Sequence, residues 1–560
     1  MKHDFEYRFR DPMKAPEDLG GKPPLYRRSV ENGVIIERDV PVRMRDGIRI
    51  YIDLFRPVDE KPAPPLIAWG PYGKHNPTSY ARQFPNCLVD TSKISPYTCF
   101  EAPDPMRWVP QGYAVITVDP RGTWYSEGDA TFVSPEERQD EYDLIEWAGT
   151  QPWSNGKVGL SGVSYLCFSQ YGAASLNPPH LAAINPWEGW SDFYREVARH
   201  GGIPETEFWG YLPSRWGFST TRIEDIRRET QEHPLFDSFW ASKNPDLSRI
   251  TVPAYVVASW TDQGLHTRGT LEAFKKISSR QKWLEVHGRK KWAYYYQEDS
   301  VRRQQAFFDR FLKDIPTEVA KWPKVRVEVR EKYYVGEMRA EEEWPIPSTQ
   351  YCKLDLNCRN GSLQRDLLSM ESSCSYAALD AQGEPARAEF DFKFDRRCDL
   401  IGNMKLKLWM SPQGADDMDI FVAIQKLDAA GKVVPFIFFN LFDDGPVALG
   451  WLRASHRELD SERSTEYQPV LQHRRELKLA DGEAVPLEIE IWPSGTRFEA
   501  GESLRLVIQG ADIYTHPKGT VQDLHQDTVN RGRHVIHAGG KYDSHLLVPV
   551  NQPSIRAELY

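Results

Sequence analysis

A serine between an apolar run and a helix-like segment is the feature of this chain that could do chemistry. The run Val158–Ser161 has the composition of a short buried strand, and the residues from Tyr165 onward have that of a helix. With Gly162 two positions before it, Ser164 would occupy a nucleophile elbow, a sharp turn that holds the hydroxyl above a parallel sheet. A serine hydroxyl is a weak nucleophile, so this turn requires a base nearby.

Candidates for an acid and a base follow later in the chain. Asp262 comes after the strand-like run Ala254–Ser259, and His287 is the last residue of another such run. In hydrolases built on a parallel sheet, the serine, the acid and the histidine occur in this order, near the ends of strands. We therefore predict that Ser164, Asp262 and His287 form a catalytic triad.

Each of these residues also has an ordinary structural explanation. An aspartate at a strand end usually completes a turn or caps a helix, and a single histidine there is more often structural. The order of the three residues is what favours the triad. His266 is a rival base, but it lies four residues after Asp262, so we expect it on the same helix rather than across the cleft from Ser164.

Hydrogen-bond donors are needed for the oxyanion that forms when a serine attacks a carbonyl. The backbone N–H of Tyr165 is one candidate, because it follows the serine directly. The segment Trp69–Lys74 follows an early strand, and the phenol of Tyr72 within it is the second candidate. The alternative is that Tyr72 only packs under its loop.

The composition is that of an ordinary globular protein with several domains. The chain has 560 residues, too many for a single core, and a net charge of −10 that argues against a general nucleic-acid binder. A polar N-terminus and the lack of a long apolar run predict neither a secretion signal nor membrane contact. Seven cysteines without a Cys-x-x-Cys pair argue against zinc and for reduced thiols in the cytoplasm, with a Cys87–Cys99 bridge left open. We expect no metal and no cofactor, and the sequence leaves a homo-oligomer open.

The first half of the chain alternates apolar runs with helix-like segments, which is typical of a parallel α/β sheet. The charged and apolar residues of Val40–Pro57 alternate, and we expect this earlier stretch to be antiparallel. The helix candidates include Glu137–Gly149 and Ser300–Lys313. The strand candidates are Leu66–Trp69, Ala114–Asp119, Val158–Ser161, Ala182–Asn185, Ala254–Ser259 and Trp283–His287.

The pattern divides the chain into three parts. Residues 1–187 and 251–315 are predicted to form an α/β domain, and residues 188–250 a helical cap over the catalytic ends of the strands, with a surface appendage as the alternative. Residues 324–560 alternate with a period of two, as in Val325–Arg330, which predicts a jelly-roll β-sandwich. Aromatic residues in and near the cap are candidates for substrate binding: Trp187, Trp190, Phe193, Trp209 and Trp260.

Longer motifs resemble those of the cocaine esterase-like (CocE/NonD) hydrolases, relatives of α-amino acid ester hydrolases and X-prolyl dipeptidyl peptidases. The motifs are spread over Arg45–Ile50, Gly70–Lys74, Asp119–Gly128, Tyr142–Trp147, Gln151–Gly159 and Gly162–Leu166. The resemblance covers most of the chain and implies an α/β-hydrolase domain, a helical cap and a C-terminal jelly roll. It also implies that Ser164 is the nucleophile, Tyr72 an oxyanion donor and Asp262 the triad acid.

Three departures from the family pattern concern the same site. Cys167 stands where many members have a glycine three residues after the serine. Lys291 occupies the family's histidine position in the segment His287–Trp292, so His287 would have to act from an earlier point on this loop. The long segment His75–Arg107 follows the oxyanion tyrosine and is expected to reshape the entrance.

The leading hypothesis is a serine hydrolase that cleaves a small-molecule carboxylic ester through an acyl-enzyme. One alternative is an amidase or peptidase of the same family, of the X-prolyl dipeptidyl peptidase or β-lactam acylase type. Such an enzyme could hold a substrate ammonium with acidic cap residues, although a solvated face is the simpler interpretation of them: Glu188, Asp192, Glu205 and Glu207. A third hypothesis is a degenerate hydrolase that binds a ligand without catalysis.

Overall fold

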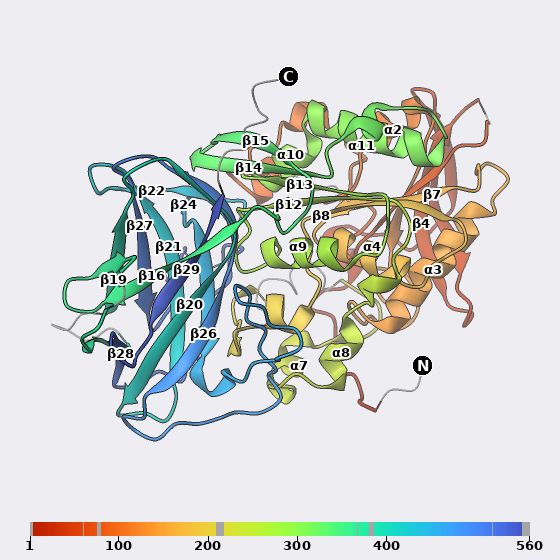
Figure 1. Cartoon of the computed structure of the whole chain (residues 1–560). Coiled ribbons are helices and arrows are strands. Elements are labelled where there is room, and N and C mark those ends of the chain that lie inside the picture. Colours follow the sequence, from red (N-terminus) through yellow and green to blue (C-terminus); the bar gives the residue numbers. More distant parts are fainter. Residues whose placement is uncertain are drawn as a thin grey trace.

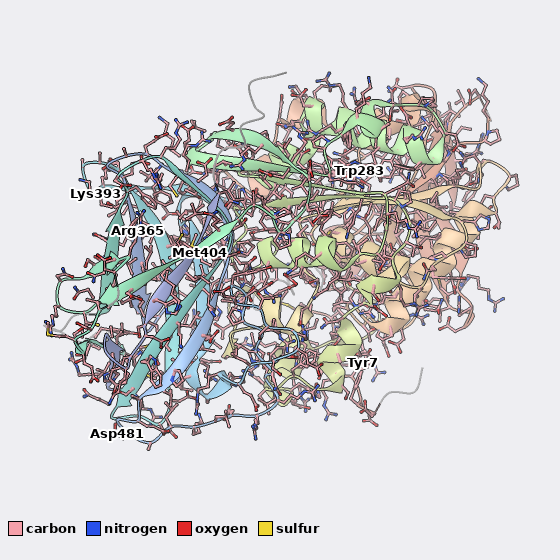
Figure 2. The ribbon with its side chains drawn as sticks, in the orientation of Figure 1. Tyr7, Trp283, Arg365, Lys393, Met404 and Asp481 are labelled. Carbon is pink, nitrogen blue, oxygen red and sulfur yellow. The ribbon has the colours of Figure 1, made fainter. Side chains whose placement is uncertain are left out.

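An α/β part and a C-terminal β part lie side by side in the chain (Figure 1). The computed structural model describes residues 4–59, 61–75, 80–208, 218–366, 368–379, 386–517 and 519–551. In Figure 1 the α/β part runs from red to green, and the β part continues from green to blue. Each part has its own buried side chains, with Trp283 in the first and Met404 in the second (Figure 2).

One mostly parallel sheet forms the centre of the α/β part, which confirms the predicted α/β class. In the strand order given below, every adjacent pair of strands from β6 to β14 is parallel. The strands β2, β3, β4 and β15 are antiparallel to the strands beside them. The central strands are apolar runs buried on both faces, as expected of a parallel sheet. The order is β2 (Arg27–Glu31), β3 (Val34–Arg43), β4 (Arg49–Pro57), β6 (Ala114–Asp119), β5 (Pro65–Trp69), β7 (Val158–Val163), β8 (Leu181–Trp187), β12 (Ala254–Ser259), β13 (Lys282–His287), β14 (Val325–Lys332) and β15 (Val335–Glu341).

Helices cover both faces of this sheet (Figure 1). One face carries α2 (Pro105–Trp108) and α11 (Glu298–Leu312), and the other carries α3 (Pro135–Gly149), α4 (Tyr165–Ala174) and α9 (Thr267–Lys276). The helix α3 begins where Ser134 Oγ accepts the N–H of Glu137, with a proline at the first helical position. Among the helices that the structure describes, none has the length and apolar composition needed to cross a membrane.

The segment between β8 and β12 contains short elements rather than long helices. The β-strand β11 pairs with β1 near the N-terminus, and α7 and α8 lie beyond α9 and α4, on the side away from the sheet (Figure 1). The elements are β1 (Phe9–Arg10), a π-helical turn (Tyr194–Ala198), β9 (Arg199–His200), β10 (Ile203–Pro204), β11 (Ile223–Glu224), α7 (Ile226–Glu232) and α8 (Ser238–Lys243). Part of the predicted cap, including Trp209, lies outside the described residues.

The β part consists of antiparallel strands around a common apolar core. The long strand β20 pairs with β26, β28 and β29, while β21 pairs with β25 and β27 in a second group. Both groups bury one face, which makes a β-sandwich, and the jelly-roll connectivity stays a prediction. The strands are β16 (Gln350–Asn357), β17 (Ser362–Gln364), β18 (Ser372–Ala377), β19 (Arg387–Lys393), β20 (Cys398–Gln413), β21 (Asp419–Leu427), β22 (Val433–Val434), β23 (Phe436–Phe438), β24 (Phe442–Gly445), β25 (Ala448–Arg453), β26 (Val485–Phe498), β27 (Ser503–Gln509), β28 (Arg533–Ala538) and β29 (His545–Asn551).

The strand β14, expected to open the sandwich, instead extends the α/β sheet. Its residue Val325 lies opposite Leu284 of β13 in a parallel register, and β15 pairs with its other side. Its pairing with the sandwich is the single match of Arg330 with Thr496. An alternating pattern indicates a strand with one face better buried than the other, and it does not say in which sheet that strand lies.

Candidate active site

Ser164 stands at a sharp turn between β7 and α4. Its φ of +61° and ψ of −114° lie where L-residues are rarely found, a strain typical of nucleophile elbows. The backbone N–H of this residue donates to the carbonyl oxygens of Trp187 and Glu188, which holds the turn. A Cβ at Gly162 would lie 2.5 Å from Leu166 Cβ, so the turn requires a glycine there. The predicted strand, turn and helix are all present.

The imidazole of His266 lies beside this serine. Its Nε2 is 3.1 Å from Ser164 Oγ, and its Nδ1 bonds to Asp262 Oδ2. Because Nδ1 donates its proton to the carboxylate, Nε2 can accept the proton of the serine hydroxyl. The indole of Trp190 stacks on the ring with 5.6 Å between centroids and 10° between planes, which fixes the ring's orientation. The serine, histidine and aspartate therefore form a hydrogen-bonded series of the kind that activates a nucleophile.

A tight turn after β12 brings Asp262 and His266 together. The carbonyl oxygen of Asp262 accepts hydrogen bonds from the N–H groups of Leu265, His266 and Thr267. Gly264 within the turn has a φ of +94°, a conformation that suits glycine. His266 is the N-cap of α9 and stands outside the helix itself. The expectation that it shares a helix with Asp262, away from Ser164, is wrong for this reason.

The prediction that His287 is the base is also wrong. This residue ends β13 as expected, but its Nε2 lies 3.0 Å from Glu188 Oε1 and its Nδ1 accepts the N–H of Arg289. The ring is fully buried and packs against the ring of Tyr294 with 4.0 Å between centroids. One ring nitrogen therefore accepts a backbone N–H and the other lies beside Glu188, so neither faces Ser164, and we interpret His287 as a structural residue.

Lys291, at the position that the family pattern gives to histidine, contacts the acid. Its Nζ lies 2.7 Å from Asp262 Oδ2 and 3.2 Å from His266 Nδ1. Its backbone N–H donates to Asn440 Oδ1 at 2.6 Å, which anchors the first residue of α10 (Lys291–Tyr296) to the β part. One carboxylate oxygen of the aspartate thus receives two donors, a ring N–H and an ammonium.

Burial and neighbouring charges set the protonation states of this cluster. Burial disfavours the ionised form of Asp262, but Lys291 and His266 outweigh it and hold the pKa of the carboxyl below its usual value. Burial lowers the pKa of His266, and the charge of Lys291 lowers it further against the pull of Asp262. Burial raises the pKa of the nearby Glu101 to about 7, although Lys291 opposes this. At neutral pH the aspartate is ionised and the histidine neutral, as a general base requires.

Both predicted oxyanion donors lie at the same end of the sheet. Tyr165 is the first residue of α4 and directly follows Ser164, and Tyr72 lines the same cavity as this serine. The loop that carries Tyr72 is anchored by Lys74, whose N–H donates to Asp119 Oδ1 at 2.8 Å. Their role in holding an oxyanion stays a prediction.

Ser164 and His266 open into a narrow cavity of about 50 Å³. Among the described residues in its wall, Glu101 is the one acidic side chain and Lys291 the one lysine or arginine. The other wall residues are mostly aromatic or apolar: Tyr72, Phe84, Phe100, Trp190, Phe208, Leu265, Trp292, Phe439, Asn440, Leu441 and Val521. Residues 439–441 belong to the turn between β23 and β24, so the β part supplies a portion of the wall.

Trp190 is the one described residue of the predicted substrate-binding set that lines this cavity. Trp187, Phe193 and Trp260 are fully buried in the hydrophobic interior and form no part of this cavity wall, so their role in binding stays a prediction. An aromatic side chain near a cap is as useful for packing as for binding, and the sequence does not separate these roles. Trp209 lies outside the described residues.

The other departures from the family pattern have simple structural outcomes. Cys167 fits because it faces Gly189, where an added Cβ would lie 2.6 Å from the cysteine Sγ. Cys87 and Cys99 are free thiols, so the bridge left open by the sequence is not formed. The segment that carries these two cysteines also contributes Glu101 to the cavity wall, as expected of an insertion near the entrance.

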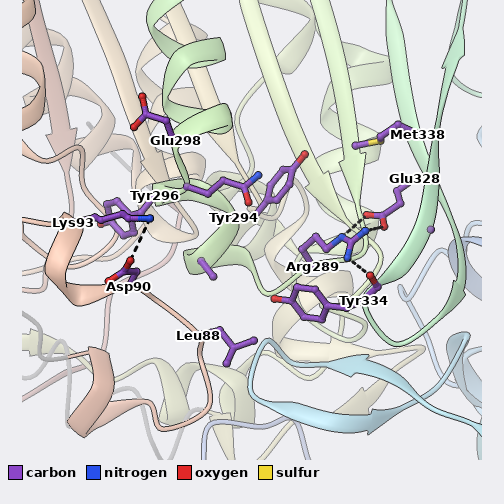
Figure 3. A pocket seen from close by; sticks show the side chains of 13 residues that line it. Leu88, Asp90, Lys93, Arg289, Tyr294, Tyr296, Glu298, Glu328, Tyr334 and Met338 are labelled. Atoms are coloured by element: carbon purple, nitrogen blue, oxygen red, sulfur yellow. Dashed lines mark hydrogen bonds and ion pairs between the residues drawn. The ribbon is translucent and has the colours of Figure 1, made fainter.

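A wider cavity of about 590 Å³ lies beside the loop between β13 and α10 (Figure 3). Arg289 in this loop donates to the carboxylate of Glu328 on β14 and to the carbonyl oxygen of Tyr334. These bonds fasten the loop that carries Lys291 to the edge of the sheet. Neither Ser164 nor His266 lines this wider cavity, so we assign the cavity no part in the reaction.

The positions of three residues at the site were missed or misjudged from the sequence: His266 beside Ser164, Lys291 beside His266, and Glu101 in the cavity wall. A glycine between Asp262 and the histidine was the available signal for the first, because Gly264 allows a turn where a helix was expected. A lysine at the family's histidine position was the signal for the second. No local pattern marked Glu101.

Two family models match the chain. The first, X-Pro dipeptidyl-peptidase (S15 family), matches residues 46–215. The second, X-Pro dipeptidyl-peptidase C-terminal non-catalytic domain, matches residues 317–547. The first range contains the serine elbow, and the second contains all strands of the β-sandwich up to β28 and the first three residues of β29.

Individual proteins resemble the chain over most of its length. A solved CocE/NonD family hydrolase from Staphylococcus aureus is 43% identical, covers 95% of this chain and 98% of its own, and has a TM-score of 0.90. The cocaine esterase of Rhodococcus sp. (strain MB1 Bresler) is 28% identical over 430 residues, which are 64% of this chain and 70% of that protein. A solved α-amino acid ester hydrolase, 17% identical with a TM-score of 0.71, covers 97% of this chain and 100% of its own and shares the fold.

Proposed function

The chain belongs to the CocE/NonD family of hydrolases, and from this premise we propose that it is a serine hydrolase that cleaves small carboxylic esters. The observation that carries the proposal is the placement of Ser164 Oγ 3.1 Å from His266 Nε2, with the other ring nitrogen bonded to Asp262. The strained backbone of the serine supports it, because such strain is typical of activated serines at elbows. The esterase names of relatives are consistent with an ester as the substrate.

In the proposed reaction, Ser164 Oγ attacks the carbonyl carbon while His266 Nε2 takes the hydroxyl proton and Asp262 holds the resulting imidazolium. The carbonyl oxygen becomes an oxyanion that accepts from the Tyr165 N–H and the Tyr72 hydroxyl. The carbon–oxygen bond to the alcohol then breaks, and Nε2 returns its proton to the leaving alcohol. A water molecule repeats both steps on the acyl-enzyme, which releases the acid and restores the serine.

Replacing the serine tests this proposal directly. Ser164→Ala should abolish hydrolysis of p-nitrophenyl acetate and prevent labelling by a fluorophosphonate probe, because the attacking oxygen is gone. Ser161→Ala is a matched control, since Ser161 lies on β7 with its hydroxyl 3.1 Å from that of Tyr295 and outside the cavity wall. Full activity in a folded Ser164→Ala variant would rule the proposal out.

Peptide-bond cleavage is the second candidate, because both matching family models are named after X-Pro dipeptidyl-peptidases. The four acidic cap residues considered for a substrate ammonium do not line the cavity. Glu188, Asp192 and Glu205 are buried rather than solvated, and Glu207 is partly exposed. Glu188 lies 3.0 Å from the ring of His287, and Asp192 pairs with Arg195. Of all the described carboxylates, Glu101 alone lines the cavity wall.

Comparing an ester with an amide substrate separates the two candidates. We expect p-nitrophenyl acetate to be hydrolysed with a kcat/KM at least about a hundredfold above that of glycyl-prolyl-p-nitroanilide. An anilide is a poorer leaving group, and Glu101 is the one carboxylate that the described cavity wall offers to a substrate ammonium. The Ser164→Ala variant gives the background rate for both substrates. A higher kcat/KM on the anilide would favour the peptidase.

A further inference from the structure

Lys291 places a buried positive charge inside the proposed catalytic group. Its side chain is almost fully buried, and its Nζ lies 2.7 Å from Asp262 Oδ2 and 3.2 Å from His266 Nδ1. The other carboxylate oxygen, Oδ1, has no hydrogen-bond partner among the described residues. The lysine and the histidine therefore share one oxygen of the acid, and the two cationic groups are neighbours whenever the ring is protonated.

The position of this ammonium is fixed from both sides. The backbone N–H of Lys291 donates to Asn440 Oδ1 at 2.6 Å. Arg289, two residues earlier, binds Glu328 of β14 (Figure 3). A lysine side chain usually keeps much rotational freedom, but here its backbone is anchored at the turn between β23 and β24 and its tip is held by Asp262. The arrangement is preorganised before any substrate arrives.

Other charged groups face this cluster from several elements. Glu188, which follows β8, acts on both His266 and Lys291, and Glu101 in the loop before α2 acts on Lys291. Asp523, between β27 and β28, lies near Asp262 and Lys291, but burial raises the pKa of its carboxyl group well above the usual value, which keeps it uncharged. Glu188 and Glu101 are therefore the acids that favour positive charge nearby. Lys291 is the cation that counters this acidic surrounding at the Nδ1 side of the ring.

A positive charge beside the ring opposes its protonation. Two unit charges in contact repel each other more strongly in a buried site than in water, because the surroundings screen less. A histidine with only the acids around it would attract a proton in weakly acidic solution and would then be unable to accept one from Ser164. With Lys291 in place, the carboxylate of Asp262 still faces Nδ1 of His266, but the imidazole is protonated less readily before the reaction begins.

We propose that Lys291 is a positioning residue whose ammonium holds the Asp262 carboxylate and keeps the His266 ring uncharged until it takes the proton of the serine. This inference rests on the proposed function, in which His266 is the general base. It gives the lysine a role that packing alone would not require. The consequence is an enzyme whose activity persists at lower pH than that of an otherwise identical enzyme without the lysine.

The test is the pH dependence of kcat/KM between about pH 4 and pH 8, measured on p-nitrophenyl acetate. Lys291→Met keeps the length of the side chain and removes the charge. In this variant the acidic limb, which is the fall in kcat/KM at low pH, should shift to higher pH by about one unit or more. In Lys291→Arg, which keeps the charge, it should stay near the wild-type position. Lys290→Met is the matched control, because Lys290 pairs with Asp443 at 2.8 Å and should leave the limb unmoved.

A purely structural lysine would give a different result. It would lower the plateau of the profile and leave the position of the acidic limb unchanged in a folded Lys291→Met variant, and that result would overturn the inference. If this variant does not fold, Lys291→Gln takes its place, with fluorophosphonate labelling as the readout. A fall in labelling that begins at higher pH than in the wild type supports the inference, and an unmoved fall rejects it.

Labelling also separates this inference from the proposed function. If Ser164 fails to react with the probe at any pH, the serine hydrolase assignment itself fails. If Ser164 is labelled but the acidic limb lies at the same pH with and without a positive charge at position 291, only the proposed role of Lys291 fails.

Discussion

Replacing His266 with alanine should remove turnover and leave the fold intact. The variant loses the only ring within hydrogen-bond distance of Ser164 Oγ in the described part of the chain, so the hydroxyl proton has no acceptor during attack. We expect kcat to fall by about 10⁴-fold or more, which corresponds to about 5.5 kcal/mol in the activation barrier. Asp262 keeps its ion pair with Lys291, so the buried carboxylate is not left without a partner.

Replacing His287 with alanine should give the opposite pattern. Loss of its ring leaves the Glu188 carboxylate buried with the Ser259 hydroxyl still bonded to it. Removing the ring leaves a space beside a buried carboxylate, and a loss of this kind costs about 1–3 kcal/mol of folding free energy, so the melting temperature should drop clearly. The kcat of the folded fraction should stay within about tenfold of wild type, because no contact of His287 involves the reacting serine.

Both variants are measured with p-nitrophenyl acetate at neutral pH, and circular dichroism melts give the folded fraction. His287→Gln is the matched control, since an amide N–H can still face Glu188. Near-wild-type turnover by His266→Ala would refute the assignment of the base. So would the loss of turnover in His287→Ala at a temperature where it is folded.

Three further predictions follow from the same geometry. Tyr72→Phe should lower kcat by about 10²–10³-fold with little change in KM, as expected for a donor that acts on the oxyanion; an unchanged kcat would leave Tyr72 a packing residue. Gly189→Ala should destabilise the protein by about 1–3 kcal/mol in urea unfolding, because the new Cβ would meet Cys167 Sγ. Adding Cys167→Gly should restore most of that stability, and no rescue would contradict the contact. Across p-nitrophenyl esters, kcat/KM should fall at least about tenfold from acetate to octanoate, since the cavity holds only about 50 Å³; equal values would disprove so narrow a site.

The sequence was sufficient for those parts of the fold that depend on local patterns. The apolar run before Ser164 is a strand because it is buried on both faces, and the helix after it begins at Tyr165 as predicted. Asp262 also follows β12 as predicted, three residues after the last residue of the strand, Ser259. Each of these features follows from residues that are adjacent in the chain, where periodicity and turn chemistry act directly.

The base could not be chosen by such reasoning, because it depends on where a ring points in space. His287 has the expected location at a strand end, yet its nitrogens face Glu188 and a backbone N–H. His266 has an unpromising location, yet the turn at Gly264 directs its ring to Ser164. The position of a residue along the chain fixes its backbone neighbourhood, and the direction of its side chain depends on tertiary contacts.

The turn between β23 and β24 joins the two parts of the protein at the reacting group. The N–H of Phe439 donates to the carbonyl oxygen of Thr261 at 2.9 Å, directly before Asp262, and Asn440 accepts the N–H of Lys291. A truncated protein that ends after the α/β sheet would therefore have a loosened acid and a cavity open to water. Substitutions at the tip of this hairpin would change the cavity wall, and with it the choice of substrate, without altering the strands that hold Ser164.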